Sequence, residues 1–259
     1  MSSVESLGPG DFGKGTKKRL PICFCLDVSG SMQGDRIASL NNALKIYFST
    51  IAVNADAVAS VDVAIVTYGG YVDVLQKFSP INSIKEVPEV VVRPRSFTPM
   101  GEGILTSLKL LELRKQGYKD RSMKYYQPWL VLITDGKPEG PDADVHFQEA
   151  LFELNKLERE EKMVVFNIGV SDDADMESLT KVSIKRSAPI RANGDNLKEY
   201  FQFLGSSSTN VVKGGETSQL YEEVVQDGDT DTQASTENGP DSGGITKPDD
   251  DFDIDKWCI

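Results

Sequence analysis

The sequence has little cysteine and almost no histidine: its 259 residues include three cysteines and one histidine. Cys23 and Cys25 fall within one predicted strand and Cys258 is the penultimate residue, a spacing that suits neither a disulfide framework nor a thiolate zinc site. We expect the two strand cysteines to be small core residues. His146, expected on the surface at the start of a helix, is a single imidazole, which excludes a histidine-dependent catalytic triad or zinc site.

Long hydrophobic runs are also missing. No apolar segment reaches the roughly 18 to 20 residues that a membrane-spanning helix needs, so no membrane association is predicted. The apolar run that follows Lys17, Lys18 and Arg19 meets Asp27 too soon for a signal peptide and lacks a small-residue cleavage site. Together with the low cysteine content, this pattern predicts a cytoplasmic protein.

Positive charge is scarce as well, and the deficit lies mostly in the last fifty residues. The net charge is −12; residues 210–259 contain 13 acidic and 3 basic residues, whereas residues 1–209 contain 27 acidic and 25 basic ones. A nearly neutral domain with an acidic tail lacks the clustered Lys and Arg that phosphate contacts require. Nucleic acid is therefore not expected as a direct partner.

The composition divides the chain into three parts. Residues 1–19 are polar and glycine-rich and are expected to form a flexible arm, residues 20–204 one domain with a sizeable core, and residues 205–259 an acidic, disordered tail. Within the tail, Phe252, Ile254 and Trp257 interrupt the polar composition and form a candidate docking motif for a partner. A simple solvated tail is the alternative interpretation.

Strand-like and helix-like segments alternate along residues 20–204. Strands are predicted at residues 20–26, 60–69, 71–78, 128–135, 163–170 and 188–191, and helices at residues 33–53, 99–117, 142–161, 175–182 and 195–204. Because Gly69 and Gly70 connect the second strand directly to the third, the third is expected to be antiparallel and at the sheet edge. The pattern predicts a three-layer, doubly wound (Rossmann-like) α/β fold: a mainly parallel six-stranded sheet with one antiparallel edge strand and helices on both faces.

Oxygen-bearing side chains follow two of the buried strands. Residues 27–31 (DVSGS) place Asp27, Ser29 and Ser31 after the first strand, and Asp135 ends the strand at 128–135. Thr98 precedes Pro99, which fits the first position of a helix with Thr98 as its N-cap. Open α/β sheets bind ligands at the carboxyl ends of their strands, and oxygen-only ligands suit a hard cation such as Mg²⁺. Helix capping alone remains the alternative explanation for residues 27–31 and for Thr98.

Taken together, these segments resemble the metal-ion-dependent adhesion site of von Willebrand factor type A (VWA) domains. The resemblance covers residues 20–204 and includes the D-x-S-x-S motif, Thr98 before a helix, and an Asp-Gly pair at 135–136 after a buried strand, in that order. It implies that Ser29, Ser31 and Thr98 ligate Mg²⁺ (or Mn²⁺) directly, while Asp27 and Asp135 bind it directly or through water. The last ligand would be an Asp or Glu of a partner protein.

The sequence is also similar to the bacterial cytosolic TerY-like branch of this family. That similarity rests on the segments RLP at 19–21, YGG at 68–70, TPMGE at 98–102 and TDGKP at 134–138. Members of the branch are associated with tellurium resistance and stress response and often accompany a Ser/Thr kinase and a PP2C-type phosphatase. The resemblance thus implies protein partners linked to phosphorylation signalling.

Three functional hypotheses follow. The leading one is a metal-dependent protein-interaction module without enzymatic activity. The alternative is a Mg²⁺-dependent phosphotransfer enzyme with Asp27 as nucleophile, although Ser29 stands where haloacid-dehalogenase-type phosphatases have a second acid. The third is a kinase substrate or adaptor regulated through the acidic tail, whose candidate phosphorylation sites are Thr230, Thr232, Ser235 and Thr236.

Overall fold

The computed structural model describes residues 8, 10–12, 15, 17–172, 174–185, 189–192 and 194–215. The candidate docking motif with Phe252, Ile254 and Trp257, the candidate phosphorylation sites and Cys258 lie outside the described residues. In chain order the elements are β1 (Leu20–Asp27), η2 (Gly30–Met32), α1 (Asp35–Ala52), α2 (Ala55–Ser60), β2 (Val61–Gly69), β3 (Tyr71–Pro80), η3 (Ile81–Ser83), α3 (Met100–Asp120), β4 (Trp129–Thr134), α4 (Ala143–Arg159), β5 (Val164–Gly169), α5 (Met176–Val182), β6 (Ile190–Arg191) and α6 (Gly194–Val212).

Six strands form one mixed sheet in the order β3-β2-β1-β4-β5-β6. β1 is parallel to both β2 and β4, and β5 and β6 continue the parallel arrangement, whereas β3 pairs antiparallel with β2 at the edge. The predicted fold class is confirmed. Because the chain leaves β1 toward β2 and later returns to β4 on the other side, the carboxyl ends of β1 and β4 form a topological switch point, where open α/β sheets bind ligands.

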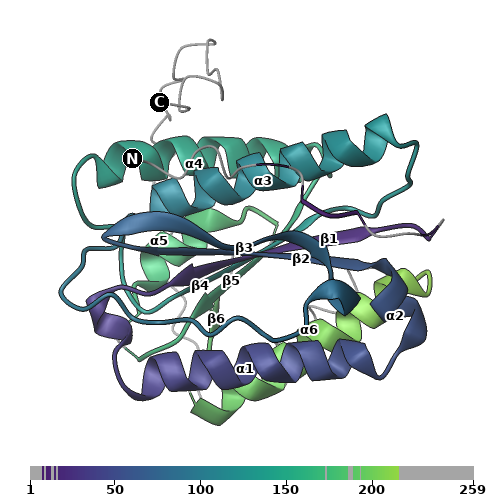
Figure 1. Cartoon of the computed structure of the whole chain (residues 1–259). Helices are drawn as coiled ribbons and strands as arrows, with labels where there is room; N and C mark the ends of the chain where they lie inside the picture. The colour runs from purple at the N-terminus through teal and green to yellow at the C-terminus, as the bar shows by residue number, and fades with distance from the viewer. Residues whose placement is uncertain are drawn as a thin grey trace, which may run out of the picture.

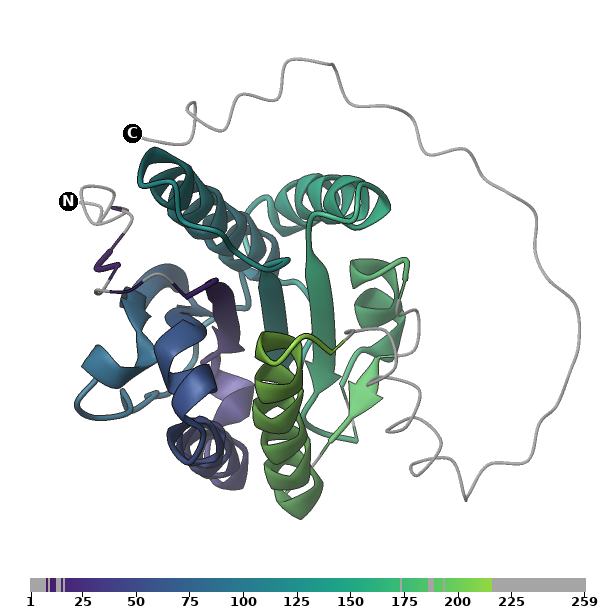
Figure 2. The same cartoon turned by 90° about the vertical axis from the view of Figure 1, so that its right-hand side faces the viewer.

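Helices cover both faces of the sheet (Figure 1 and Figure 2). α1 and α6 pack side by side on one face, and α3 and α4 pack side by side on the other. In β1, Ile22, Phe24 and Leu26 face the core beneath α1 and α6, while Cys23 and Cys25 face the core beneath α3 and α4. Both cysteines are fully buried, as predicted, and burial raises the pKa of Cys23 to about 12 and that of Cys25 well above its ordinary value.

The last helix is longer than the sequence suggested. α6 continues to Val212, so the domain boundary expected at residue 204 falls inside a helix. The small residues that suggested disorder instead form a close helix contact: a Cβ on Gly205 would lie 2.7 Å from the Thr50 side chain of α1, and Ser208 Oγ lies 3.1 Å from the Tyr47 hydroxyl. Composition alone does not distinguish such packing from a linker, because both use Gly and Ser.

Two other helices differ from the prediction. α2 was not predicted, since a segment of six residues is too short to show a helical period. α3 runs to Asp120 rather than ending near residue 117. Within the described residues, no helix combines the length and the apolar character needed to cross a membrane.

Part of the N-terminal segment packs on the domain. Phe12 is buried, and the guanidinium groups of Arg114 and Arg121 each lie 4.0 Å from its ring centroid. Gly117 makes room for the ring, because a Cβ there would lie 2.1 Å from it. The expectation of a flexible arm over residues 1–19 is therefore wrong at Phe12, since a single aromatic residue produces no periodic signal in the sequence.

Candidate metal centre

Asp27 ends β1 at the carboxyl edge of the sheet and is buried. Its two carboxylate oxygens accept separate hydrogen bonds: Oδ1 from the Ser29 backbone N–H at 2.8 Å and Oδ2 from the Thr134 hydroxyl at 2.6 Å. Burial raises the pKa of Asp27 to about 6 and the Asp135 carboxylate adds to the rise, while the bonds from Thr134 and Ser29 oppose it. Neither donor carries a positive charge, so neither neutralises the ionised carboxylate.

Ser29 and Ser31 lie in the loop that leaves β1 and connect it to the loop after β4. Their Oγ atoms are 3.0 Å apart, and Ser31 Oγ donates to Asp135 Oδ1 at 2.7 Å across a sequence separation of 104 residues. Ser29 is buried, whereas Ser31 is exposed at the rim, which is the edge of the sheet at the carboxyl ends of β1 and β4. The structure therefore brings Asp27, Ser29, Ser31 and Asp135 together at one edge of the sheet.

Thr98 lies at the same edge, just before α3, but it does not cap that helix. The N-cap position is Pro99, so the predicted role of Thr98 as N-cap is wrong by one residue. The Thr98 carbonyl instead joins the loop after β4 by accepting a hydrogen bond from the Glu139 N–H at 2.9 Å, and a Cβ on Gly136 would lie 3.9 Å from Thr98 Oγ1. The Thr98 hydroxyl thus lies beside the residue that follows Asp135, without a hydrogen-bond partner in the part of the chain that the structure describes.

Two glycines let neighbouring segments approach the loop after β1. A Cβ on Gly69 would lie 2.8 Å from the Ser29 backbone nitrogen, and a Cβ on Gly30 would lie 2.9 Å from the Arg95 nitrogen. Side chains do not pack that closely on backbone, so both positions require glycine. The contact at Gly30 holds the segment before Thr98 against the serine loop.

The donor set fits a hard divalent cation. It comprises two carboxylates and three hydroxyls, and oxygen ligands are the chemistry that Mg²⁺ and Mn²⁺ prefer. Two adjacent ligands of an octahedral ion at ~2.1 Å are ~3.0 Å apart, and the Ser29 and Ser31 Oγ atoms have this separation. The described residues contain no group of three or more His, Cys, Asp or Glu side chains suited to a metal, so a metal here would depend on the hydroxyls.

Comparison with known families identifies the domain. The model of the von Willebrand factor type A domain family matches residues 22–203, which is most of the chain. The chain belongs to this family. VWA domains are typically adhesion or protein-interaction modules. A comparison with curated proteins gave no match.

Solved structures similar to this VWA domain include adhesins and pilus proteins. The pilus adhesin SpaC from Lactobacillus rhamnosus GG, in its open conformation, is 13% identical with a TM-score of 0.56, and the match covers 77% of this chain and 31% of SpaC. The PilB minor pilin from Streptococcus sanguinis is 14% identical with a TM-score of 0.54, over 80% of this chain and 65% of PilB. Proximal thread matrix protein 1 from the mussel byssus is 17% identical with a TM-score of 0.51, over 73% of this chain and 48% of that protein. The chain spans less than two thirds of each, and at these identities the likeness shows the fold alone.

Two residues to which the sequence analysis gave no role donate hydrogen bonds to the two carboxylates at the rim of the VWA domain. Thr134, the last residue of β4, donates to Asp27, and Arg36, in the first turn of α1, donates through Nη1 to Asp135 Oδ2 at 2.6 Å. The register of β4 against β1 places Thr134 beside Asp27. The spacing of residues along the sequence does not determine this register or the position of α1 over Asp135, so neither contact could be predicted.

His146 is not on the surface as expected. It is buried at the start of α4, and its Nδ1 lies 3.0 Å from Glu102 Oε1 of α3. Gly101 permits this close approach of the two helices, because a Cβ there would lie 2.3 Å from the His146 carbonyl carbon. The close packing of Gly101 on the His146 backbone therefore places the start of α3, and with it Thr98, against α4.

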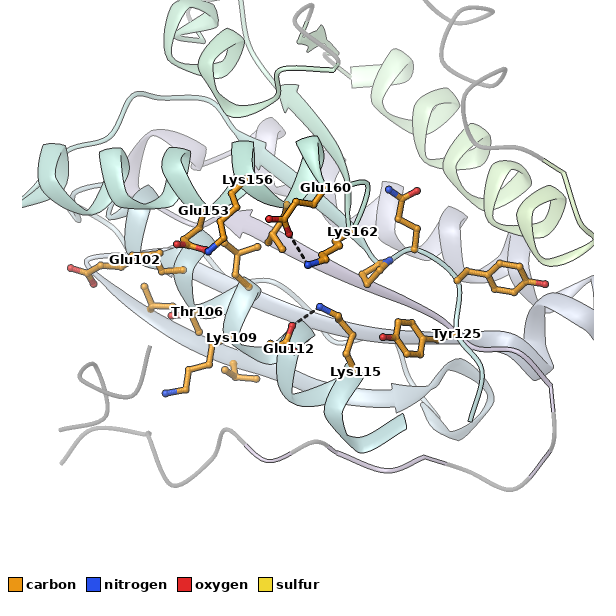
Figure 3. Close-up of a pocket in the computed structure, with 18 of the residues that line it drawn as sticks. Glu102, Thr106, Lys109, Glu112, Lys115, Tyr125, Glu153, Lys156, Glu160 and Lys162 are labelled. Atoms are coloured by element: carbon orange, nitrogen blue, oxygen red, sulfur yellow. Dashed lines mark hydrogen bonds and ion pairs between the residues drawn. The ribbon is translucent and has the colours of Figure 1, made fainter. Parts of the chain in front are cut away.

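A larger hollow of this VWA domain lies between α3 and α4, away from the rim (Figure 3). Its volume is about 940 Å³, and its lining includes apolar side chains such as Leu105. Lysines and glutamates around it pair with each other, as Lys115 does with Glu112 and Lys162 with Glu160. None of the five predicted metal ligands lines this hollow, so the hollow is separate from the candidate metal centre.

Proposed function

We propose that this protein is a metal-dependent protein-interaction module. Asp27, Ser29, Ser31, Thr98 and Asp135 would hold Mg²⁺ (or Mn²⁺), and an Asp or Glu side chain of a partner protein would supply the remaining ligand. The observation that carries the proposal is the convergence of oxygens from loops far apart in sequence, above all the 2.7 Å contact between Ser31 and Asp135. A bound ion would contribute the positive charge that attracts the partner's carboxylate.

The residues of the chain perform distinct tasks in such a site. Thr134 and the Ser29 N–H orient Asp27, so its carboxylate is fixed in advance. The serine and threonine hydroxyls are neutral ligands, and two carboxylates only just balance the charge of a divalent ion. An acidic side chain from outside is therefore a favourable last ligand.

Basic side chains around the rim favour an acidic partner surface. Arg95 lies against Gly30, and Lys137 follows Asp135 by two residues; both basic side chains are exposed. Arg36 adds a third positive charge beside Asp135. Charges in this arrangement steer an acidic surface toward the site and speed its association.

The same geometry argues against Asp27 as the nucleophile of a phosphotransfer enzyme. The side chain is fully buried, and both of its oxygens accept hydrogen bonds. An attacking carboxylate needs an oxygen that can approach the phosphorus in line. We therefore propose a module without enzymatic activity.

The proposal extends to the setting that the TerY-like resemblance implies. We propose a cytoplasmic module whose partners are a Ser/Thr kinase and a PP2C-type phosphatase in a stress or tellurite-resistance-type system, with the segment around Phe252, Ile254 and Trp257 as a second contact. Affinity purification of the full chain from its native host, in Mg²⁺ and in EDTA, tests this setting. We expect these partners only in Mg²⁺; the same partners in EDTA would contradict the metal dependence.

Metal titration of the full chain tests the site itself. Calorimetry with Mg²⁺ or Mn²⁺ should show one bound ion for the wild type, and an affinity lower by at least about tenfold for Ser31→Ala. Ser49→Ala is the matched control, because the Ser49 hydroxyl bonds within α1 to the Ile46 carbonyl, remote from the rim. Equal affinities for Ser31→Ala and Ser49→Ala would contradict the proposed site.

A further inference from the structure

Arg36 lies where its own helix does not favour a positive charge. It is the second residue of α1, and the positive end of the helix dipole makes cations unfavourable in the first turn. Its side chain is 34% exposed, and Nη1 donates to Asp135 Oδ2 at 2.6 Å and to the Ser31 carbonyl at 3.1 Å. The contacts at the rim therefore account for the position of this guanidinium.

These contacts engage both carboxylate oxygens of Asp135. Its Oδ1 accepts from Ser31 Oγ, its Oδ2 accepts from Arg36, and the side chain is buried. A divalent cation that reached this carboxylate would meet the guanidinium on the second oxygen. Two positive charges that share one carboxylate repel each other, and the burial of that carboxylate reduces the screening by water.

A small hollow beside Arg36 offers the guanidinium another place. Its volume is about 240 Å³, and its lining includes Asp35, Ser39 and Asp172 together with Arg36 itself. Carboxylates match the planar guanidinium, and the long arginine side chain can turn about its single bonds. On leaving Asp135, the arginine would therefore find other acidic groups close by.

We propose that Arg36 is a built-in competitor of the metal: its guanidinium occupies Asp135 in the metal-free protein and turns toward the hollow beside Asp35 and Asp172 when a divalent cation binds. This inference rests on the proposed metal site and adds a regulation of it. The protein then loads metal only above a concentration that Arg36 sets. The same five ligands without Arg36 would bind the ion more tightly.

Metal affinities of full-length variants test this competition. Calorimetric titration with Mg²⁺ would compare the wild type with two neutral variants, Arg36→Met and Arg36→Gln. We expect both to bind at least about tenfold more tightly, since each removes the competing charge. Arg159→Met is the matched control: it makes the same change in net charge at an exposed position in the last turn of α4, near the amino end of β5, and should leave the affinity unchanged.

The outcomes separate the inference from the proposal on which it rests. Tighter binding by both neutral variants supports the competition, together with a larger rise in melting temperature on addition of Mg²⁺ than in the wild type. Affinities equal to or weaker than that of the wild type, in variants whose melting in EDTA shows that they are folded, overturn the inference while the metal site stands. If none of the three proteins binds Mg²⁺, the metal site is overturned, and the inference with it.

Discussion

Two buried aspartates at opposite ends of neighbouring strands have hydrogen-bond donors of different charge. Asp62, near the amino end of β2, accepts hydrogen bonds from Arg19, Arg114 and Tyr118, with Arg114 Nη2 at 2.7 Å and Arg19 Nε at 3.2 Å. Asp27, at the carboxyl end of β1, accepts from a backbone N–H and a hydroxyl. The chain itself supplies the countercharge at the amino edge, whereas the carboxyl edge presents a carboxylate suited to a cation from outside.

The difference separates a structural cluster from a candidate binding site. A buried carboxylate between two guanidinium groups is compensated, and removing one partner of such a cluster is strongly destabilising. A buried carboxylate with neutral donors is unfavourable when ionised, which is why the pKa of Asp27 rises to about 6. Unfavourable charges of this kind concentrate at functional sites. The comparison gives three predictions, in order of decreasing effect.

The largest effect is expected for Asp62→Asn. The substitution leaves Arg19 and Arg114 buried without their countercharge, and it should lower the free energy of unfolding by about 3–5 kcal/mol. Urea denaturation measures the loss. Mg²⁺ should not restore the stability, because the cluster lies at the other end of the strands from the candidate metal centre. A loss below about 1 kcal/mol would show that the cluster is not what stabilises the amino edge.

A smaller effect of opposite sign is expected for Asp27→Asn. The substitution removes a buried negative charge, so in EDTA at neutral pH the variant should unfold with a free energy about 1–3 kcal/mol higher than the wild type. Mg²⁺ should raise the melting temperature of the wild type but not that of the variant. If Asp27→Asn in EDTA were less stable than the wild type, Asp27 would not carry an unfavourable charge, and the contrast with the compensated Asp62 would be wrong.

The smallest effect is the pH dependence of this difference. Because the folded-state pKa of Asp27, about 6, lies above the ordinary value of 3.8, the cost of its charge is fully present above about pH 6, decreases as the pH falls below the folded-state pKa, and is gone only below the ordinary value. The stability gap between Asp27→Asn and the wild type in EDTA should therefore shrink from about pH 7 to about pH 5. Urea denaturation of both proteins at each pH measures it. A constant gap would mean that Asp27 does not titrate in this range.

Most of the fold could be predicted because strands buried on both faces appear as continuous apolar runs. β1, β4 and β5 lie within one residue of their predicted bounds, and the alternating segment that became β3 is antiparallel at the edge, as expected. The boundary at residue 204 failed for a physical reason. Gly and Ser occur both in linkers and where two helices pack closely, as Gly205 does against Thr50.

The candidate site could be predicted as an edge of the sheet but not as a set of contacts. The carboxyl ends of β1 and β4 share one edge, which is why Ser31 and Asp135 meet. The bond from Thr134 to Asp27 depends on strand register, and the bond from Arg36 to Asp135 depends on where α1 lies over the rim. Neither register nor helix placement is contained in the spacing of residues along one sequence.

Chemical labelling of the two cysteines of β1 can measure how often the interior of the sheet is exposed. Cys23 and Cys25 are fully buried, and burial raises the pKa of both thiols. Because alkylating reagents react with the thiolate, the folded protein protects both sulfur atoms. Their modification requires β1 to separate from its neighbours, so the labelling rate at these positions reports how often the strand that ends in Asp27 opens.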